Sequence, residues 1–161
     1  MEVTSYAIAL GSNQRHPRWG APERVLVAAT DALDVPVLAR SRIIRSRPLG
    51  PSRRMYANAT VVVETAMEPP ELLEHLHAIE AAFGRRRRGG RWGSRVLDLD
   101  IVLWSAGAWA DETMAIPHVR FRGRRFVLGP LAEIAPNWRD PVTGKTIRQL
   151  TACLDRRRPH P

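Results

Sequence analysis

Short apolar runs, separated by clusters of glycine, proline, serine and asparagine, predict β-strands in several parts of the chain. The clearest is Ala-Thr-Val-Val-Val-Glu-Thr at 59–65, because β-branched side chains fit the pleated surface of a sheet. The first predicted strand ends at the turn cluster 11–13, and the second is interrupted early by Pro36. The predicted strands cover residues 5–10, 35–44, 56–65 and a segment from Asp98, with a return strand starting at Trp109 after a turn at 105–108.

Other segments place apolar residues three and four positions apart, which is the spacing of an amphipathic α-helix. In the first such segment these residues are Val25, Leu26, Ala29 and Leu33. A proline is tolerated in the first turn of a helix, so Pro22 and the pair Pro69-Pro70 mark helix starts. The predicted helices cover residues 22–33, 68–83, 125–134 and 147–154.

The order of these elements is β-α-β-β-α-β, followed by a hairpin and two helices. This order predicts an α+β fold with a ferredoxin-like antiparallel sheet and helices packed on it. A chain of 161 residues without a linker or an internal repeat is expected to form one domain, 1–161. Residues 156–161, which begin with Arg156-Arg157-Arg158, are expected to form a disordered tail. Folds of this kind carry many activities, so the function has to be argued from the site.

The chain is strongly basic, with a formal net charge of +9. All but one of its 25 basic residues are arginine, and the exception is Lys145. Such a charge favours anionic partners, which include nucleic acid, an anionic membrane surface and phosphorylated small molecules. The arginine bias also has a neutral explanation in a GC-rich coding sequence, so charge alone does not choose between these partners.

Composition excludes several other classes of protein. Cys153 is the only cysteine, which excludes an internal disulfide framework, and no Cys/His cluster indicates zinc. Residues 1–6 lack the basic stretch and apolar core of a secretory leader. No apolar run approaches the ~18 residues of a membrane span. We therefore expect a cytoplasmic protein that does not enter a membrane. A monomer is expected because no strip of apolar surface stands out.

The stretch Arg-Val-Leu-Asp-Leu-Asp-Ile-Val at 95–102 carries the main chemical signal. Asp98 and Asp100 are two residues apart on a predicted strand, so their side chains project from the same face. Paired carboxylates repel each other but together form a hard oxygen site for Mg²⁺. With Arg91 and Arg95 just upstream, the pair suits a polyphosphate, whose oxygens the metal and the guanidinium groups would share. Taken alone, the same pattern also fits an edge strand with a solvated acidic face.

Four ordered motifs between residues 6 and 150 resemble those of the 6-hydroxymethyl-7,8-dihydropterin pyrophosphokinase family. They are Ala9-Leu-Gly-Ser-Asn13; Ser46-Arg-Pro-Leu-Gly-Pro51 leading to Tyr56-Ala-Asn-Ala59; Glu80 with the loop through Asp100; and Ile116-Pro-His118 with 124–136. The resemblance implies a transferase that moves a pyrophosphoryl group from ATP to the pterin hydroxymethyl oxygen, giving AMP and the pterin diphosphate of folate biosynthesis. It also implies that Asp98 and Asp100 bind two Mg²⁺ ions that bridge the ATP phosphates.

The resemblance assigns further residues to the nucleotide. Arg85, Arg87 and Arg91 align with basic positions of the family's mobile catalytic loop, and Arg95 aligns with a ligand of the ATP phosphates. Trp92 either seals that loop over the nucleotide or packs in the core. His118 and Arg124 are expected near phosphate, Glu80 near the ribose, and the backbone of Ile101 near adenine. His77, Thr113, Ala115 and Val119 depart from the residues common at these positions in the family.

A second group is assigned to the pterin, a flat and polar heteroaromatic ring. Tyr56 and Phe126 occupy the family's stacking positions, and Asn58 offers hydrogen bonds to the ring edge. Ser46, Pro48 and Leu49 are expected to contribute mainly through backbone groups.

Two alternatives to the enzyme are a ferredoxin-like RNA-binding module and a non-catalytic relative. RNA-binding modules of this kind usually carry several aromatic residues on the sheet, whereas the strands predicted here are mostly aliphatic. The paired aspartates would also repel phosphates unless a metal intervened. We therefore expect small-molecule substrates and no nucleic-acid partner.

Overall fold

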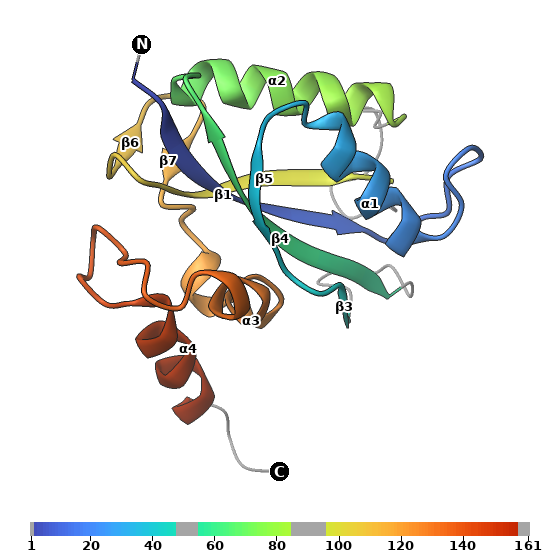
Figure 1. Cartoon of the computed structure of the whole chain (residues 1–161). Helices are drawn as coiled ribbons and strands as arrows, with labels where there is room; N and C mark the ends of the chain where they lie inside the picture. Colours follow the sequence, from blue (N-terminus) through green and yellow to red (C-terminus); the bar gives the residue numbers. More distant parts are fainter. Residues whose placement is uncertain (1, 48–54, 85–95, 158–161) are drawn as a thin grey trace.

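The computed structural model describes residues 2–47, 55–84 and 96–157, and within these residues five strands form one antiparallel sheet (Figure 1). They are β1 (Thr4–Ser12), β2 (Val37–Arg40), β3 (Ile44–Ser46), β4 (Tyr56–Thr65) and β5 (Asp98–Trp104). The order across the sheet is β2-β4-β1-β5, and β3 pairs with β4 next to β2. Because β4 lies between β1 and β2, the first β-α-β unit is split by an antiparallel strand. This topology confirms the predicted ferredoxin-like α+β fold.

Helices cover both faces of the sheet (Figure 1). On one face α1 (Pro22–Ala32) and α2 (Pro69–Ala82) pack over Tyr6, Ile8 and Leu10 of β1. On the other face η1 (Phe121–Gly123), α3 (Arg125–Ile134) and α4 (Ile147–Arg156) form a second core with Ala7, Val102 and Leu103. The side chains of one strand therefore alternate between two separate apolar cores.

The ends of the helices follow from local sequence. Proline occupies the first turn of both α1 and α2, as predicted. After α2, Gly84 takes a φ of +95°, a conformation that favours glycine and ends the helix. At the start of α4, the Thr146 hydroxyl accepts a hydrogen bond from the Gln149 backbone N–H at 3.1 Å. The Gln149 side chain accepts one from the Thr146 N–H at 2.9 Å, which completes a capping box.

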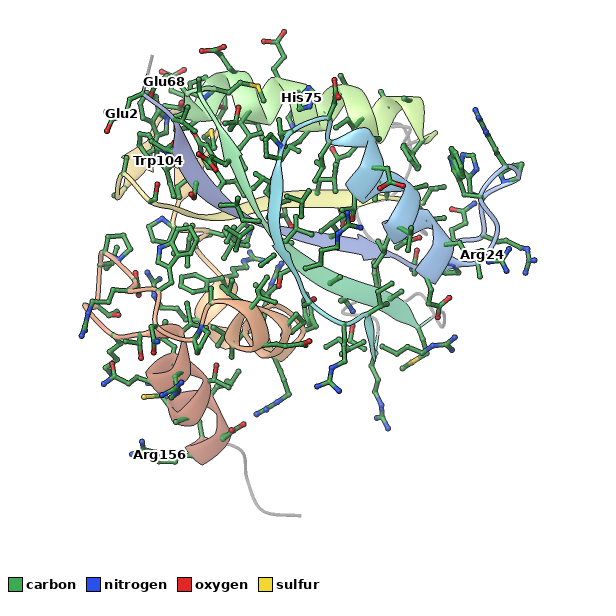
Figure 2. The ribbon with its side chains drawn as sticks, in the orientation of Figure 1. Glu2, Arg24, Glu68, His75, Trp104 and Arg156 are labelled. Atoms are coloured by element: carbon green, nitrogen blue, oxygen red, sulfur yellow. The ribbon has the colours of Figure 1, made fainter. Side chains whose placement is uncertain are left out.

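A direct contact also ties the two helices of the first face. Figure 2 labels His75 on α2, whose Nε2 lies 2.7 Å from the Leu33 carbonyl oxygen just beyond α1. None of the helices in the described ranges has both the length and the apolar character needed to cross a membrane.

Three boundary predictions were wrong. The strand predicted over 35–44 is two strands, because the backbone N–H and the side chain of Ser41 both bond to Thr60 of β4 and break the ladder there. The first strand continues through Gly11 and Ser12 instead of turning, since both residues pair with β4. The tail prediction fails at Arg156, which is the last residue of α4 and which Arg157 caps; residues 158–161 lie outside the described residues.

The predicted hairpin after β5 is present. It consists of β6 (Trp109–Ala110) and β7 (Ala115–Ile116), which pair only with each other within the described residues. Trp109 packs edge-on against Trp104 with ring centroids 6.1 Å apart, and Trp104 stacks on Tyr6 at 5.9 Å. These aromatic contacts attach the hairpin to one end of the sheet, beside the residue Trp104 labelled in Figure 2.

We expect Thr60→Val to stabilise the protein. Thr60 is fully buried, and its hydroxyl has no hydrogen-bond partner among the described residues. Because the desolvated hydroxyl is uncompensated, replacing it with a methyl group should raise the free energy of unfolding by about 1–2 kcal/mol. The measurement is urea unfolding followed by circular dichroism.

Thr30→Val is the matched control. Thr30 is also buried, but its hydroxyl donates a hydrogen bond to the Leu26 carbonyl oxygen at 2.8 Å. Its replacement should therefore give no gain. An unchanged or lower stability for Thr60→Val would show that the Thr60 hydroxyl is satisfied in solution.

Candidate active site

The predicted site residues meet where β4, β1 and β5 lie side by side. The register places Gly11 of β1 between Asn58 of β4 and Asp98 of β5. One step along the strands, Ala9 lies between Thr60 and Asp100. Residues directly opposite each other in a sheet project from the same face, so both aspartates and Asn58 share one face. This face is the one that α3 covers further along the sheet.

The middle strand of this face carries almost no side-chain volume. A Cβ placed on Gly11 would lie 3.4 Å from Asn58 Oδ1 and 3.6 Å from Tyr56 Cδ1. The glycine therefore places no side chain between the Asn58 amide and the Asp98 carboxylate. The sequence pattern predicts a turn at Gly11 and does not reveal this role. A glycine inside a strand is itself a signal for close approach of a ligand.

The Asn58 amide is held in one orientation. Its side chain is 5% exposed, and its Nδ2 donates a hydrogen bond to the Ser46 hydroxyl at 2.6 Å. This bond turns Oδ1 toward the space above Gly11. Ser46 thus orients Asn58 through its side chain, in addition to the backbone role predicted for it.

The two predicted stacking residues come from different layers. Tyr56 is half-buried at the start of β4, and Phe126 is half-buried in the first turn of α3. Because α3 packs on β3 and β4, Phe126 lies on the same side of the sheet as Asn58 and the two aspartates. The guanidinium of Arg124 lies 5.6 Å from the Phe126 ring centroid, within cation–π range. Stacking of a ligand between Tyr56 and Phe126 stays a prediction.

A cavity of about 800 Å³ opens along the edge of β5 that pairs with no strand in the described part of the chain. Its walls are α2, the edge of β5 and the segment from β7 to Val119. The residues that it shares with the predicted site are Glu80, Asp100, Ile101 and His118, and it also contains His77, Thr113, Ala115 and Val119, the positions that depart from the family. Asp100 belongs both to this cavity and to the sheet face. The two predicted substrate regions therefore meet at Asp100.

Glu80 connects α2 to the strand that carries the aspartates. Its side chain is 4% exposed, and Oε2 accepts a hydrogen bond from the Leu99 backbone N–H at 2.9 Å. Leu99 lies between Asp98 and Asp100, so this bond fixes the backbone at the centre of the pair. Ile101, two residues further, presents its own N–H and C=O to the same edge and hence to the cavity. The ribose contact predicted for Glu80 stays a prediction.

His118 is placed by an irregularity in β5. Ala7 pairs with Leu103 and Ile8 pairs with Ile101, so Val102 is an extra residue, or β-bulge. The Val102 carbonyl oxygen accepts a hydrogen bond from the His118 N–H at 3.0 Å. The Arg120 N–H donates to His118 Nδ1 at 3.2 Å, so neutral His118 carries its proton on Nε2. His118 is also one of the residues that line the cavity.

The groups around His118 act on its pKa in opposite directions. Burial lowers the pKa of His118 below its ordinary value, Asp100 acts to raise it, and Arg124 and Arg120 act to lower it. His118, Asp100, Arg124 and Arg120 are therefore close enough to interact electrostatically. Such a cluster, with one carboxylate among cationic groups, is suited to hold an anion that carries a metal.

The aspartate pair suits a magnesium site that phosphate and water complete, rather than a metal site formed by protein ligands alone. Within the described ranges, no group of three or more His, Cys, Asp and Glu side chains is placed to hold a metal. Mg²⁺ in nucleotide sites is commonly held by one or two carboxylates, with phosphate oxygens and water completing the octahedron. Asp98 and Asp100 are both half-buried on one face, which matches this requirement.

Several predicted site residues lie outside the described residues. They are Pro48, Leu49, Arg85, Arg87, Arg91, Trp92 and Arg95. Their assignments rest on the sequence and stay predictions.

Comparison with known proteins identifies relatives across most of the chain. The family model described as 7,8-dihydro-6-hydroxymethylpterin-pyrophosphokinase matches residues 7–136. A Synechocystis protein named 2-amino-4-hydroxy-6-hydroxymethyldihydropteridine pyrophosphokinase is 47% identical over 111 residues, which cover 69% of this chain and 56% of that protein. A protein of the same name from Methylorubrum extorquens is 38% identical over 158 residues, which cover 95% of each.

The fold is also found among solved structures. The crystal structure of Plasmodium falciparum HPPK-DHPS with pteroate matches with a TM-score of 0.71 at 14% identity, over 94% of this chain and 42% of that one. The chain thus spans about half the length of the Synechocystis relative and less than half of the Plasmodium chain. At this identity the structural likeness shows the fold alone. The family match over 7–136 establishes that the chain belongs to the 7,8-dihydro-6-hydroxymethylpterin-pyrophosphokinase family.

Proposed function

We propose that this protein transfers a pyrophosphoryl group from ATP to the hydroxymethyl oxygen of 6-hydroxymethyl-7,8-dihydropterin. The products are AMP and the pterin diphosphate, in a step of tetrahydrofolate biosynthesis. The observation that carries the proposal is the position of Asp100, which shares a sheet face with Asn58 and Asp98 and also lines the cavity at the sheet edge. Two substrates bound in these regions would meet beside the aspartate pair.

The sheet face suits the pterin. Its flat ring would lie over Gly11, with its polar edge toward the Asn58 Oδ1 that Ser46 holds in place. Tyr56 and Phe126 would supply aromatic contact from the sheet and from α3. The hydroxymethyl group would then point toward Asp98, which is opposite Asn58 across the glycine.

The edge cavity suits ATP. Its volume of about 800 Å³ is within the range of cofactor and nucleotide sites. The Ile101 backbone would meet the adenine edge, and the His118 Nε2–H and the Arg124 guanidinium would face the phosphates. Arg85, Arg87, Arg91 and Arg95 would add positive charge to bind the phosphates.

Asp98 and Asp100 would hold magnesium, which we propose as two ions. Bound Mg²⁺ would neutralise phosphate charge and help align the phosphate chain with the attacking alcohol. The other contribution of the protein would be to position the two substrates, because a direct displacement at phosphorus needs no covalent intermediate. Glu80 supports this positioning by fixing the strand between the two aspartates.

The alternatives receive less support. A ferredoxin-like RNA-binding module offers one sheet face to bases, whereas here helices pack on both faces. A non-catalytic relative has no need of an aspartate pair beside the edge cavity. A monomeric state and a cytoplasmic location remain predictions from the sequence.

The test is a product assay. The purified protein is incubated with ATP, magnesium and 6-hydroxymethyl-7,8-dihydropterin, and nucleotides are separated by anion exchange. We expect one AMP for each pterin consumed, and no reaction when EDTA removes the metal. Formation of ADP would indicate simple phosphoryl transfer, and absence of turnover would favour one of the two alternatives.

A further inference from the structure

The turn between β6 and β7 is organised by one carboxylate. Asp111 Oδ1 accepts hydrogen bonds from the Thr113 N–H at 2.7 Å, the Thr113 hydroxyl at 2.8 Å and the Met114 N–H at 3.0 Å. Its Oδ2 accepts a fourth from the Trp109 indole N–H at 2.8 Å. The Asp111 N–H also donates to the Met114 carbonyl oxygen at 3.0 Å. Asp111 is itself exposed, so these bonds do not serve to satisfy a buried charge.

The residues that Asp111 holds form a wall of the edge cavity. Thr113, Met114 and Ala115 all line it, and the chain then continues through β7 to His118. The bond to Trp109 joins the turn to the aromatic stack of Trp109, Trp104 and Tyr6, which is anchored in the core. Asp111 therefore connects an exposed turn both to the fixed end of the sheet and to the cavity wall.

Under the proposed function, this wall would lie against the base of the nucleotide. Asp100, which would hold metal-bound phosphates, is the cavity residue that also lies on the sheet face, and it is close enough to His118 to interact electrostatically. The turn contributes the apolar side chains of Met114 and Ala115, and the Thr113 hydroxyl is engaged by Asp111. An apolar wall of this kind suits the face of a purine ring rather than a charged group.

We propose that Asp111 is a positioning residue for nucleotide binding: it holds the 111–115 turn in the shape that contacts the base, without touching the substrate. The inference rests on the proposed function, since it takes the edge cavity to be the ATP site. It goes beyond that function in assigning base-side affinity to a residue outside the cavity. Without the carboxylate the turn loses four hydrogen bonds, and the nucleotide must order it on binding.

The test separates base binding from phosphate binding by isothermal titration calorimetry without pterin. The ligands are MgATP, AMP and magnesium tripolyphosphate. For Asp111→Ala we expect the affinity for MgATP and AMP to fall about tenfold, with tripolyphosphate affinity unchanged. In the product assay, the KM for ATP should rise while kcat at saturating ATP stays the same.

Two further variants sharpen the result. Asp111→Asn keeps an Oδ1 acceptor for three of the four bonds and should remain within about threefold of the wild-type affinity. Glu112→Ala removes the same charge from the neighbouring exposed position and should leave all three affinities unchanged. Unchanged AMP affinity in Asp111→Ala would overturn the proposal, as would equal weakening of tripolyphosphate or an equal effect of Glu112→Ala.

The proposal and the function that it rests on fail in different ways. A wild-type protein that binds AMP but forms no product from the pterin would contradict the proposed function alone. A wild-type protein that is active but insensitive to Asp111→Ala would contradict the positioning role alone. A wild-type protein that does not bind AMP would overturn the positioning role as well.

Discussion

Asp100→Asn is expected to lower kcat for AMP formation by about a thousandfold or more, because metal-assisted charge stabilisation is worth several kcal/mol. Asparagine keeps the size of the side chain but removes the charge that would hold the cation. Asp100 is the aspartate that borders both substrate regions, so its loss affects their junction directly. The measurement is the initial rate of AMP formation at saturating ATP, pterin and magnesium.

The variant should fold normally, since removing one of two neighbouring like charges does not weaken a sheet. A second readout is the pKa of His118, followed by NMR. Because Asp100 acts to raise that pKa, its neutralisation should lower the pKa further. Asp31→Asn, on the exposed face of α1, is the charge-matched control and should leave turnover unchanged. A turnover of Asp100→Asn within tenfold of the wild type would contradict the assignment.

Asp140→Asn is expected to destabilise the protein by about 3–5 kcal/mol, the usual cost of breaking a buried ion pair by removing one partner. The Asp140 side chain is inaccessible to solvent and forms a bidentate pair with Arg122, at 2.6 Å to Nε and 2.9 Å to Nη2. It also accepts hydrogen bonds from the Val142 N–H and the Thr143 hydroxyl. The pair joins η1 to the connection between α3 and α4.

The loss should depend on pH. Burial acts to raise the pKa of Asp140, but the hydrogen bonds from Arg122, Thr143 and Val142 outweigh it and lower the pKa from 3.8 to about 2. The folded-state pKa is thus below the unfolded one, so the stabilisation is present above about pH 4 and is lost as pH falls toward 2. This pH-dependent part amounts to about 2 kcal/mol.

Urea unfolding of the wild type and the variant between pH 2 and pH 7 measures the effect. The difference between them should be largest at neutral pH and shrink in acid. Glu133→Gln is the control, because its partner Arg42 is 86% exposed and such surface pairs contribute about 0–1 kcal/mol. A difference that stays constant across this range would mean that Asp140 is not ionised in the folded protein.

Much of the fold was predictable because local and tertiary preferences agree. The β-branched run at 59–65 falls in a central strand buried on both faces, and the helix predicted over 125–134 has those bounds in the structure. Prediction failed where a distant contact decides the conformation. Ser41 breaks a strand through bonds to Thr60, and pairing with β4 keeps Gly11 extended despite its turn-like neighbours.

The candidate site also has features that the sequence predicts and features that depend on distant contacts. The spacing of Asp98 and Asp100 is sufficient to predict that both side chains project from one face of a strand. The contacts of Glu80 with Leu99 and of Asn58 with Ser46 depend on which strands and helices become neighbours, and no sequence spacing encodes them. Asp111 has no role visible from composition or periodicity, because its importance lies in the shape of a turn.

The extra residue in β5 constrains how this protein can change length during evolution. Leu99 and Ile101 belong to the core under α1 and α2, whereas Val102 and Leu103 belong to the core under α3 and α4. Deletion of one residue within β5 would move either the two carboxylates or Leu103 to the opposite face of the sheet. Homologues that lack the bulge should therefore carry an exchanged pattern of large and small side chains downstream, and viable single-residue deletions should be absent between the aspartates and Trp104.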